Sequence, residues 1–76
     1  MNMYIDRAIR KYEEKHRARL YIRVLARDVF PDTKDPVIAT HNLNNLRSGR
    51  VTSIKLSTLK ALCSRLECTA SELLNF

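Results

Sequence analysis

The sequence predicts a small all-α domain built from five short helices. Its 76 residues suffice for one domain with a small core, and 45% of them are hydrophobic, which is normal for a folded chain. Apolar residues recur at intervals of three and four along several segments, as they do on the buried side of an amphipathic helix. The single glycine and the two prolines all lie where such a segment begins or ends.

Two helices are expected in the N-terminal part, over residues 4–20 and 21–30. The second must stop near Phe30, because Pro31 disfavours helical geometry in the residue before it. Both segments have an apolar stripe of the right spacing. The stripes consist of Ile5, Ala8, Ile9 and Tyr12 in the first helix, and of Ile22, Leu25, Ala26 and Val29 in the second.

A third helix is expected over residues 36–48, after a polar turn at 30–35. Asp35 is a preferred N-cap residue, and Pro36 suits the first helical position, where its missing N–H is not needed. Gly49 follows directly, where a residue in the left-handed conformation commonly ends a helix. The expected core positions of this helix are Ile38, Ala39, Leu43 and Leu46.

The C-terminal part predicts two more helices. After a connection with some extended character at 51–56, Ser57 is expected to cap a fourth helix. A capping box at Thr69–Glu72, with Cys68 and Leu73 as its hydrophobic staple, starts a fifth helix that runs through Leu74 to Phe76. The core stripe of the fourth helix is Leu59, Leu62, Cys63 and Leu66. Both cysteines are expected to be reduced, structural thiols.

Positive charge is concentrated in two segments. The 14 Lys and Arg residues outnumber the eight Asp and Glu residues, for a net charge of +6. Residues 1–27 have eight basic and three acidic groups, a net +5, and residues 47–60 have four basic groups and no acid. Clustered positive charge on a small domain indicates a polyanionic partner, most often nucleic acid. A solvated surface without such a partner is the alternative.

The outward face of the third predicted helix is polar and has no carboxylate. Amide and hydroxyl side chains can read base edges in the major groove, since Asn pairs with adenine and Thr contacts thymine or bonds either base. An exposed polar face is also ordinary in a helix without this function. The residues opposite the core stripe are Thr40, Asn44, Arg47 and Ser48, flanked by His41 and Asn45. Asn42, nearest the apolar side, is expected to be half-buried and structural.

Three sets of residues together point to a known family. They are Leu25-Ala26, the series Ile38, Leu43, Leu46 and Gly49, and the run SIKLSTLKALCSRLECTASELL up to Leu74. In this order and spacing they resemble the Cro/C1-type (XRE) helix-turn-helix domain, in its compact single-domain variant. The resemblance covers nearly the whole chain. It implies a lambda-repressor-like fold in which residues 1–76 form one domain, with the helix-turn-helix at about 20–48.

The resemblance also implies a site, because the third helix of that family docks in the major groove of double-stranded DNA. The family's base-reading positions fall on Thr40, His41, Asn44 and Asn45, and its backbone-contacting position before the glycine falls on Ser48. Charge and position add Arg47 and Arg50 as phosphate contacts. Where the family often has a phosphate-binding Gln, this chain has Ile22. Arg23 or Tyr21 is expected to substitute for it.

The turn at 30–35 departs from the family, which usually has three or four residues between the two helices. An enlarged turn could hold the helices at another angle, and the base contacts depend on that angle. A homodimer on a palindromic site is also expected from the resemblance. Tyr4 and Phe76 are the candidate contacts between the two copies.

The predicted function is a sequence-specific, DNA-binding transcriptional regulator of the cytoplasm, nucleoid-associated and bacterial or phage-like by resemblance. An interaction module of the same fold, antitoxin-like or regulator-binding, is the alternative. RNA binding is less favoured, because no aromatic cluster is available for base stacking. No apolar run approaches the roughly 20 residues of a membrane span. The sequence has no glycine-rich phosphate loop and no Cys/His cluster of zinc spacing, so we expect no enzyme activity, cofactor or metal site.

Overall fold

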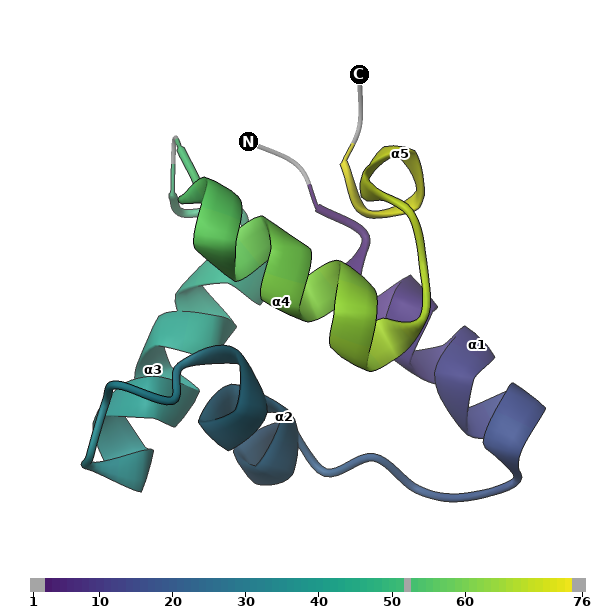
Figure 1. The fold of residues 1–76 in the computed structure, drawn as a ribbon, viewed down its shortest axis with the longest axis horizontal. Coiled ribbons are helices and arrows are strands. Elements are labelled where there is room, and N and C mark those ends of the chain that lie inside the picture. The colour runs from purple at the N-terminus through teal and green to yellow at the C-terminus, as the bar shows by residue number, and fades with distance from the viewer. Residues whose placement is uncertain (1–2, 52, 75–76) are drawn as a thin grey trace.

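Five helices connected by loops make up the described part of the chain (Figure 1). The structure, a computed structural model, describes residues 3–51 and 53–74. The only strand-like pairing among them is an isolated antiparallel bridge between Met3 and Leu74. The predicted all-α class is therefore confirmed. The helices are α1 (Ile5–His16), α2 (Ile22–Val29), α3 (Pro36–Arg47), α4 (Leu56–Leu66) and α5 (Ala70–Leu73).

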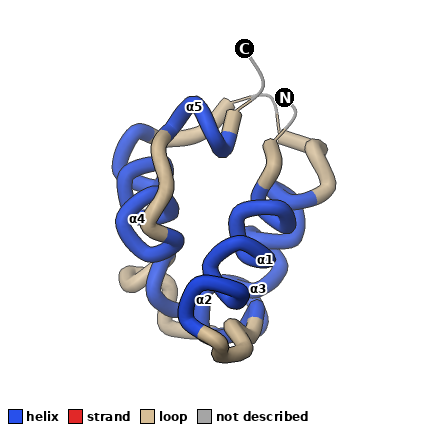
Figure 2. The backbone as a smooth tube through the Cα atoms, turned by 90° about the vertical axis from the view of Figure 1, so that its right-hand side faces the viewer, coloured by secondary structure: helices blue, strands red, loops and turns tan. Residues whose placement is uncertain are grey.

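One hydrophobic core lies between α4 and the other long helices. Figure 2 shows α4 on one side of the molecule and α1, α2 and α3 on the other. Of all the helix pairs, α2 and α3 pack most closely, and α4 crosses both α1 and α2. The buried side chains are Ile5, Ala8, Ile9, Leu20, Leu25, Ala26, Val29, Ala39, Leu43, Leu46, Leu62, Leu66 and Leu73.

The third helix has the ends that its sequence predicts. The Asp35 side chain caps α3 by accepting a hydrogen bond from the Val37 N–H, and Pro36 occupies the first turn. At the other end Gly49 has φ 75°, the left-handed conformation that glycine adopts without a steric penalty. Its N–H bonds the Leu46 carbonyl, and the Arg50 N–H bonds the Asn45 carbonyl. This pair of bonds is a Schellman motif, which satisfies carbonyls that the helix leaves free.

Ile38 does not belong to the core, contrary to the expectation from its spacing. Its side chain is 52% exposed, whereas Ala39 and Leu43 are buried. Helical residues are about 100° apart around the axis, so the buried positions Ala39, Leu43 and Leu46 span only about 60°, and Ile38 lies well outside this sector. The first turn of α3 is thus held to the core by Ala39 alone.

The first helix is shorter than predicted and ends at His16, not at residue 20. Arg17 adopts a left-handed conformation with φ 50°, and its N–H bonds the Glu13 carbonyl. No apolar residue between Tyr12 and Ala18 could hold another turn to the core. The chain then leaves the helix axis, and Leu20 enters the core from the connection to α2.

The start of the fourth helix was also predicted wrongly. Lys55, not Ser57, is the N-cap residue, and no side chain caps this end. The Leu59 N–H bonds the Lys55 carbonyl at 3.0 Å, so the first turn is already closed when the chain reaches Ser57. Leu56, the first helical residue, is 63% exposed and makes no contribution to the core.

The last helix starts with the predicted capping box between Thr69 and Glu72. It ends sooner than expected, because Leu74 has the extended angles φ −104° and ψ 142°. The rest of the predicted helix, with Phe76 as a candidate dimer contact, lies outside the described residues. The Tyr4 N–H bonds the Leu73 carbonyl at 2.7 Å, which joins the segment before α1 to α5 at one end of the molecule (Figure 2).

Both cysteines are free thiols and half-buried. Burial, with a smaller effect of the neighbouring Cys63, raises the pKa of the Cys68 thiol to about 11. Such a thiol stays protonated at neutral pH and is a poor nucleophile. None of the helices in the described ranges combines the length and the apolar character that crossing a membrane requires.

Candidate nucleic-acid interface

The outward face of α3 borders an open groove beside the start of α2. The face is presented to solvent because Ala39, Leu43 and Leu46 hold the opposite side of the helix in the core. Within this groove Val37 is 74% exposed, and His41 and Asn44 are also exposed, whereas Thr40 is half-buried. The groove has a volume of about 570 Å³ and is lined by Arg23, Pro36, Val37, Thr40, His41 and Asn44.

Three of the four predicted base-reading residues therefore lie together, and the fourth does not. Thr40, His41 and Asn44 share the groove, but Asn45 is half-buried and lines a separate hollow with Asn42. Asn45 is about 100° from Asn44 around the helix axis, which turns it toward the loop between α3 and α4. Asn42 is half-buried, as its place near the apolar side predicts.

The predicted phosphate-contacting residues lie at both ends of this face. Arg23 lines the groove from α2, and Tyr21, at the N-cap position of α2, is 56% exposed. At the C-terminal end of α3, the Ser48 hydroxyl donates to the Asn45 carbonyl at 3.1 Å. Arg50 follows just beyond it and is exposed.

Arg47 is held differently from the other basic residues of this region. Its Nε donates to the Asp6 carboxylate on α1 at 2.6 Å, and its Nη1 donates to the Asn44 side-chain oxygen at 2.8 Å. The Arg47 side chain is only 30% exposed as a result. A phosphate would have to compete with Asp6 for this guanidinium.

The start of α2 is suited to an anion. No side chain caps this end, and the first turn contains no acidic residue. The first N–H groups of a helix lack partners within the helix and bear a partial positive charge, so anions are stabilised there. Arg23 and the Tyr21 ring stand beside this helix end.

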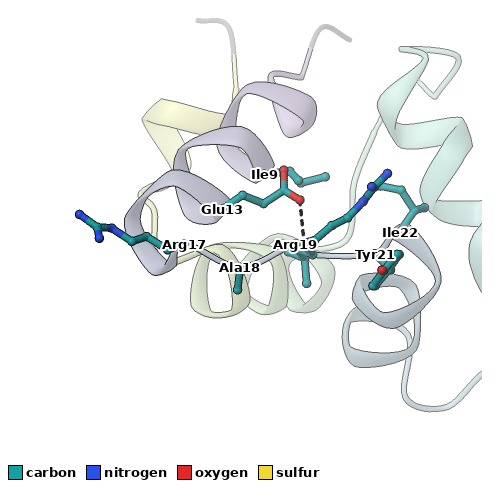
Figure 3. A pocket seen from close by; sticks show the side chains of 8 residues that line it. Ile9, Glu13, Arg17, Ala18, Arg19, Tyr21 and Ile22 are labelled. Carbon is teal, nitrogen blue, oxygen red and sulfur yellow. Dashed lines mark hydrogen bonds between the residues drawn. The ribbon is translucent and has the colours of Figure 1, made fainter.

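The connection between α1 and α2 is ordered by one carboxylate. Figure 3 shows Glu13 reaching from α1, where its Oε2 accepts the Leu20 N–H at 2.8 Å. This bond fixes the connection just before Tyr21. The Arg19 guanidinium lies 5.4 Å from the centre of the Tyr21 ring, within the range of a cation–π interaction. Arg17 points away from α2 in the same view.

Two residues of this surface were missed by the sequence reasoning, Val37 and Arg19. Val37 is one turn before His41 and Thr40, so helical spacing alone could have placed it on their face. Its side chain is apolar, so a pattern of polar base-reading side chains does not include it. Arg19 had no comparable signal, since its position beside Tyr21 depends on where α1 ends.

Other basic residues are paired with acids away from the groove. Arg65 bonds Asp28 at 2.7 Å and the Tyr12 hydroxyl at 2.9 Å, and these bonds raise the pKa of its guanidinium. Glu67 bonds Lys15 at 3.0 Å and His16 at 2.6 Å, which joins the end of α4 to the end of α1. No carboxylate is among the described residues that line the groove, so its charge comes from Arg23.

The packing of α2 against α3, with the outer face of α3 exposed beside the start of α2, defines a helix-turn-helix domain. The chain belongs to the family of Cro/C1-type helix-turn-helix DNA-binding domains, whose model matches residues 34–76. This match begins just before α3 and runs through α4 and α5. The family to which the sequence pointed is thus confirmed, over residues 34–76.

A curated relative agrees with the family match. The chain is 41% identical over 39 residues to a Bacillus subtilis (strain 168) protein named "Uncharacterized HTH-type transcriptional regulator YozG". The alignment covers 51% of this chain and 46% of that protein, so the chain spans about half the length of the curated relative it matches. No solved structure matches the chain significantly.

Proposed function

We propose that the protein is a sequence-specific, double-stranded DNA-binding transcriptional regulator that inserts α3 into the major groove. The observation that supports this best is the groove beside α3, where the exposed Asn44 and His41 and the half-buried Thr40 meet Arg23 without any carboxylate among the lining residues. The family match favours DNA binding over the alternative of an interaction module. A regulator that binds chromosomal DNA would work in the cytoplasm of a bacterial cell.

In this proposal the base contacts come from the first three turns of α3. Asn44 and His41 offer hydrogen bonds to base edges, and Thr40 offers a hydroxyl or a methyl group. Val37 joins them, because its exposed isopropyl group fits the C5-methyl group of thymine. Asn45 would reach DNA only from the edge of the face, where it is half-buried.

Contacts to phosphates would flank the base contacts on both sides. At the start of α2, Tyr21, Arg23 and the free N–H groups of the first turn would hold one phosphate. Beyond the end of α3, Ser48 and Arg50 would meet the backbone on the other side. Such contacts position the helix and carry no sequence information themselves.

A homodimer on a palindromic site is part of the proposal. Helix-turn-helix dimers place two recognition helices one DNA turn apart, about 34–36 Å, on symmetric half-sites. A monomer bound to one half-site would contact too few bases to distinguish a single site in a genome. Sedimentation of the complex with DNA of one and of two half-sites measures the stoichiometry.

Selection of bound DNA from a random pool tests the proposed function. We expect an enriched motif with two inverted half-sites, and a pool without any enriched sequence would overturn the proposal. Titrations of the best sequence at several salt concentrations then separate base reading from electrostatics, because phosphate contacts make binding fall with salt on all sequences alike.

Two variants assign the roles of the groove residues. Asn44→Ala should remove the preference at one base position, at a cost of about 1–3 kcal/mol for the preferred base. Arg50→Ala should weaken binding to every sequence by a similar factor and leave the preferences intact. If both variants lost discrimination equally, the division into base-reading and phosphate-binding residues would be wrong.

A further inference from the structure

A chain of hydrogen bonds links α1 to the groove face of α3. It runs from the Asp6 carboxylate to Arg47 Nε, at 2.6 Å, and from Arg47 Nη1 to Asn44 Oδ1, at 2.8 Å. Asp6 lies 41 positions from Arg47 in the sequence. A residue of the first helix therefore acts on the amide that is proposed to read a base.

These bonds fix which way the Asn44 amide faces. A guanidinium group has N–H donors and no acceptor, so only the carbonyl oxygen of Asn44 can face Arg47. The amide NH2 group is consequently turned to the other side. Among the described residues no hydrogen bond engages this NH2 group, and Asn44 is exposed in the groove.

Each residue of this hydrogen-bonded series directly follows a buried residue in the sequence. Asp6 follows Ile5, which is 0% exposed, and Asn44 follows Leu43, also 0% exposed. Arg47 follows Leu46, which is 5% exposed. Because these three leucine and isoleucine side chains belong to one core, the distance between the two helices is set by packing. The Arg47 guanidinium therefore bridges α1 and α3 across a distance that the core packing fixes.

We propose that Asp6 and Arg47 are positioning residues that hold Asn44 as a hydrogen-bond donor, and that the base it reads is guanine. This inference rests on the proposed DNA-reading function. Guanine offers two acceptors in the major groove, N7 and O6, which the free NH2 group can approach. Adenine offers this NH2 group only N7, and its bidentate pairing would need the Asn44 oxygen to accept from the N6 amino group. The cationic Arg47 already bonds that oxygen, and its positive charge repels amino hydrogens.

This role differs measurably from a phosphate contact by Arg47. If Arg47 neutralised a phosphate, removing Asp6 would free its charge, strengthen binding on all sequences and steepen the dependence on salt. If Arg47 positions Asn44, removing Asp6 releases the amide, and discrimination at one base position falls. The two roles thus predict changes in different quantities: affinity and its salt dependence in the first case, and base discrimination in the second.

The protein contains a matched control for the Asp6→Ala substitution. Asp28 bonds Arg65 Nε at 2.7 Å, and the Arg65 side chain is 30% exposed, as is that of Arg47. Neither residue lines the groove beside α3. Asp6→Ala and Asp28→Ala each remove one negative charge and the carboxylate that bonds an arginine Nε, but only Asp6 is linked through its arginine to Asn44. Asp28 also lies 3.6 Å from Arg27 Nε, so its removal perturbs at least as many ion pairs as the removal of Asp6.

The experiment compares these variants on DNA selected by the unchanged protein. The selected site is synthesised in four versions, with guanine or one of the other three bases at one position. This is the position at which Asn44→Ala abolishes the base preference. We expect Asp6→Ala to lower the preference for guanine at this position by about threefold or more, out of the roughly five- to hundredfold that a good base contact gives. Asp28→Ala should leave the preference unchanged, and both variants should keep the salt dependence of the parent protein.

A double substitution makes the test specific for Asn44. In an Asn44→Ala background, Asp6→Ala should have no further effect on base preference, since the group that it positions is gone. Circular dichroism checks that every variant is folded. Exposed ion pairs contribute little to stability, so the two single variants should melt at similar temperatures.

Three results would overturn the inference. They are a selected base other than guanine at the Asn44 position, an equal effect of Asp6→Ala and Asp28→Ala, and a uniform gain in affinity with a steeper salt dependence after Asp6→Ala. The proposed function itself fails in a different way, namely if the unchanged protein selects no motif at all.

Discussion

The Asp35 carboxylate accepts a hydrogen bond of 2.9 Å from the backbone N–H of Val37. This bond satisfies one of the free donors at the start of α3, and Pro36 between the two residues needs none. The same first turn presents Val37 to the groove. The cap of the helix and the proposed DNA-reading face are therefore one structural unit.

Removal of this cap should weaken both stability and DNA binding. We expect Asp35→Ala to lower the free energy of unfolding by about 1 kcal/mol, within the range of roughly 0.5–2 kcal/mol for N-cap residues. Urea denaturation followed by circular dichroism measures this change. Asp32→Ala is the control, because Asp32 is an exposed residue of the same loop outside the cap and its removal changes the charge equally. Equal losses in both variants would contradict the role of the cap.

Local chemistry explains which parts of the fold could be predicted from sequence. Asp35, Pro36 and Gly49 act on backbone groups within a few residues, so the ends of α3 followed from the sequence. The capping box at Thr69–Glu72 is equally local. These features need no knowledge of what packs against the helix.

Features that depend on packing were predicted less well. Ile38 has the spacing of a core residue, but it lies about 80° around the helix axis from the nearest buried position, Leu46, and it is 52% exposed. The left-handed residue that ends α1 is Arg17 and not a glycine, so the sequence does not indicate this helix end. The contact between Asp6 and Arg47 joins residues 41 positions apart and requires the folded arrangement of α1 and α3. For this reason the proposed role of Arg47 could not be found from its charge.

Two of the three left-handed residues in the described ranges predict opposite effects of substitution. Gly49 has φ 75° and Arg17 has φ 50°. A residue with a Cβ atom loses roughly 1–2 kcal/mol in this conformation, and glycine does not. We expect Gly49→Ala to destabilise the domain by about 1 kcal/mol, and Arg17→Gly to stabilise it by up to about 1 kcal/mol. Thermal melting measures both, and a destabilised Arg17→Gly would show that the Arg17 side chain contributes more than its conformation costs.

The contacts of Glu67 predict how stability responds to acid. The hydrogen bond from Lys15 and, more weakly, that from His16 hold the pKa of the Glu67 carboxyl below its ordinary value of 4.5. The folded state therefore favours the charged carboxylate, and its contribution is present above the pKa of the unfolded chain and is lost as the pH falls through the lower folded value. We expect Glu67→Gln to be less stable than the parent protein at neutral pH, with a difference that shrinks in acid.

Chemical denaturation at a series of pH values between neutral and strongly acidic checks this expectation. Glu14→Gln is the matched control, since Glu14 is exposed on α1 and forms no ion pair among the described residues. Its effect should stay small at every pH. A Glu67→Gln protein that differed from the parent by the same amount at all pH values would disprove the linkage.

The last prediction concerns Arg23, which enters the groove from α2 while the proposed base-reading residues enter it from α3. If Arg23 meets a phosphate, Arg23→Ala should weaken binding to all sequences and lower the slope of log affinity against log salt by about 0.9, the value for one phosphate contact. Arg10→Ala removes an equal charge from the exposed side of α1 and should leave the slope nearly unchanged. A change in base preference after Arg23→Ala, without a change in slope, would instead make Arg23 a base-reading residue, since its guanidinium is long enough to reach a guanine edge.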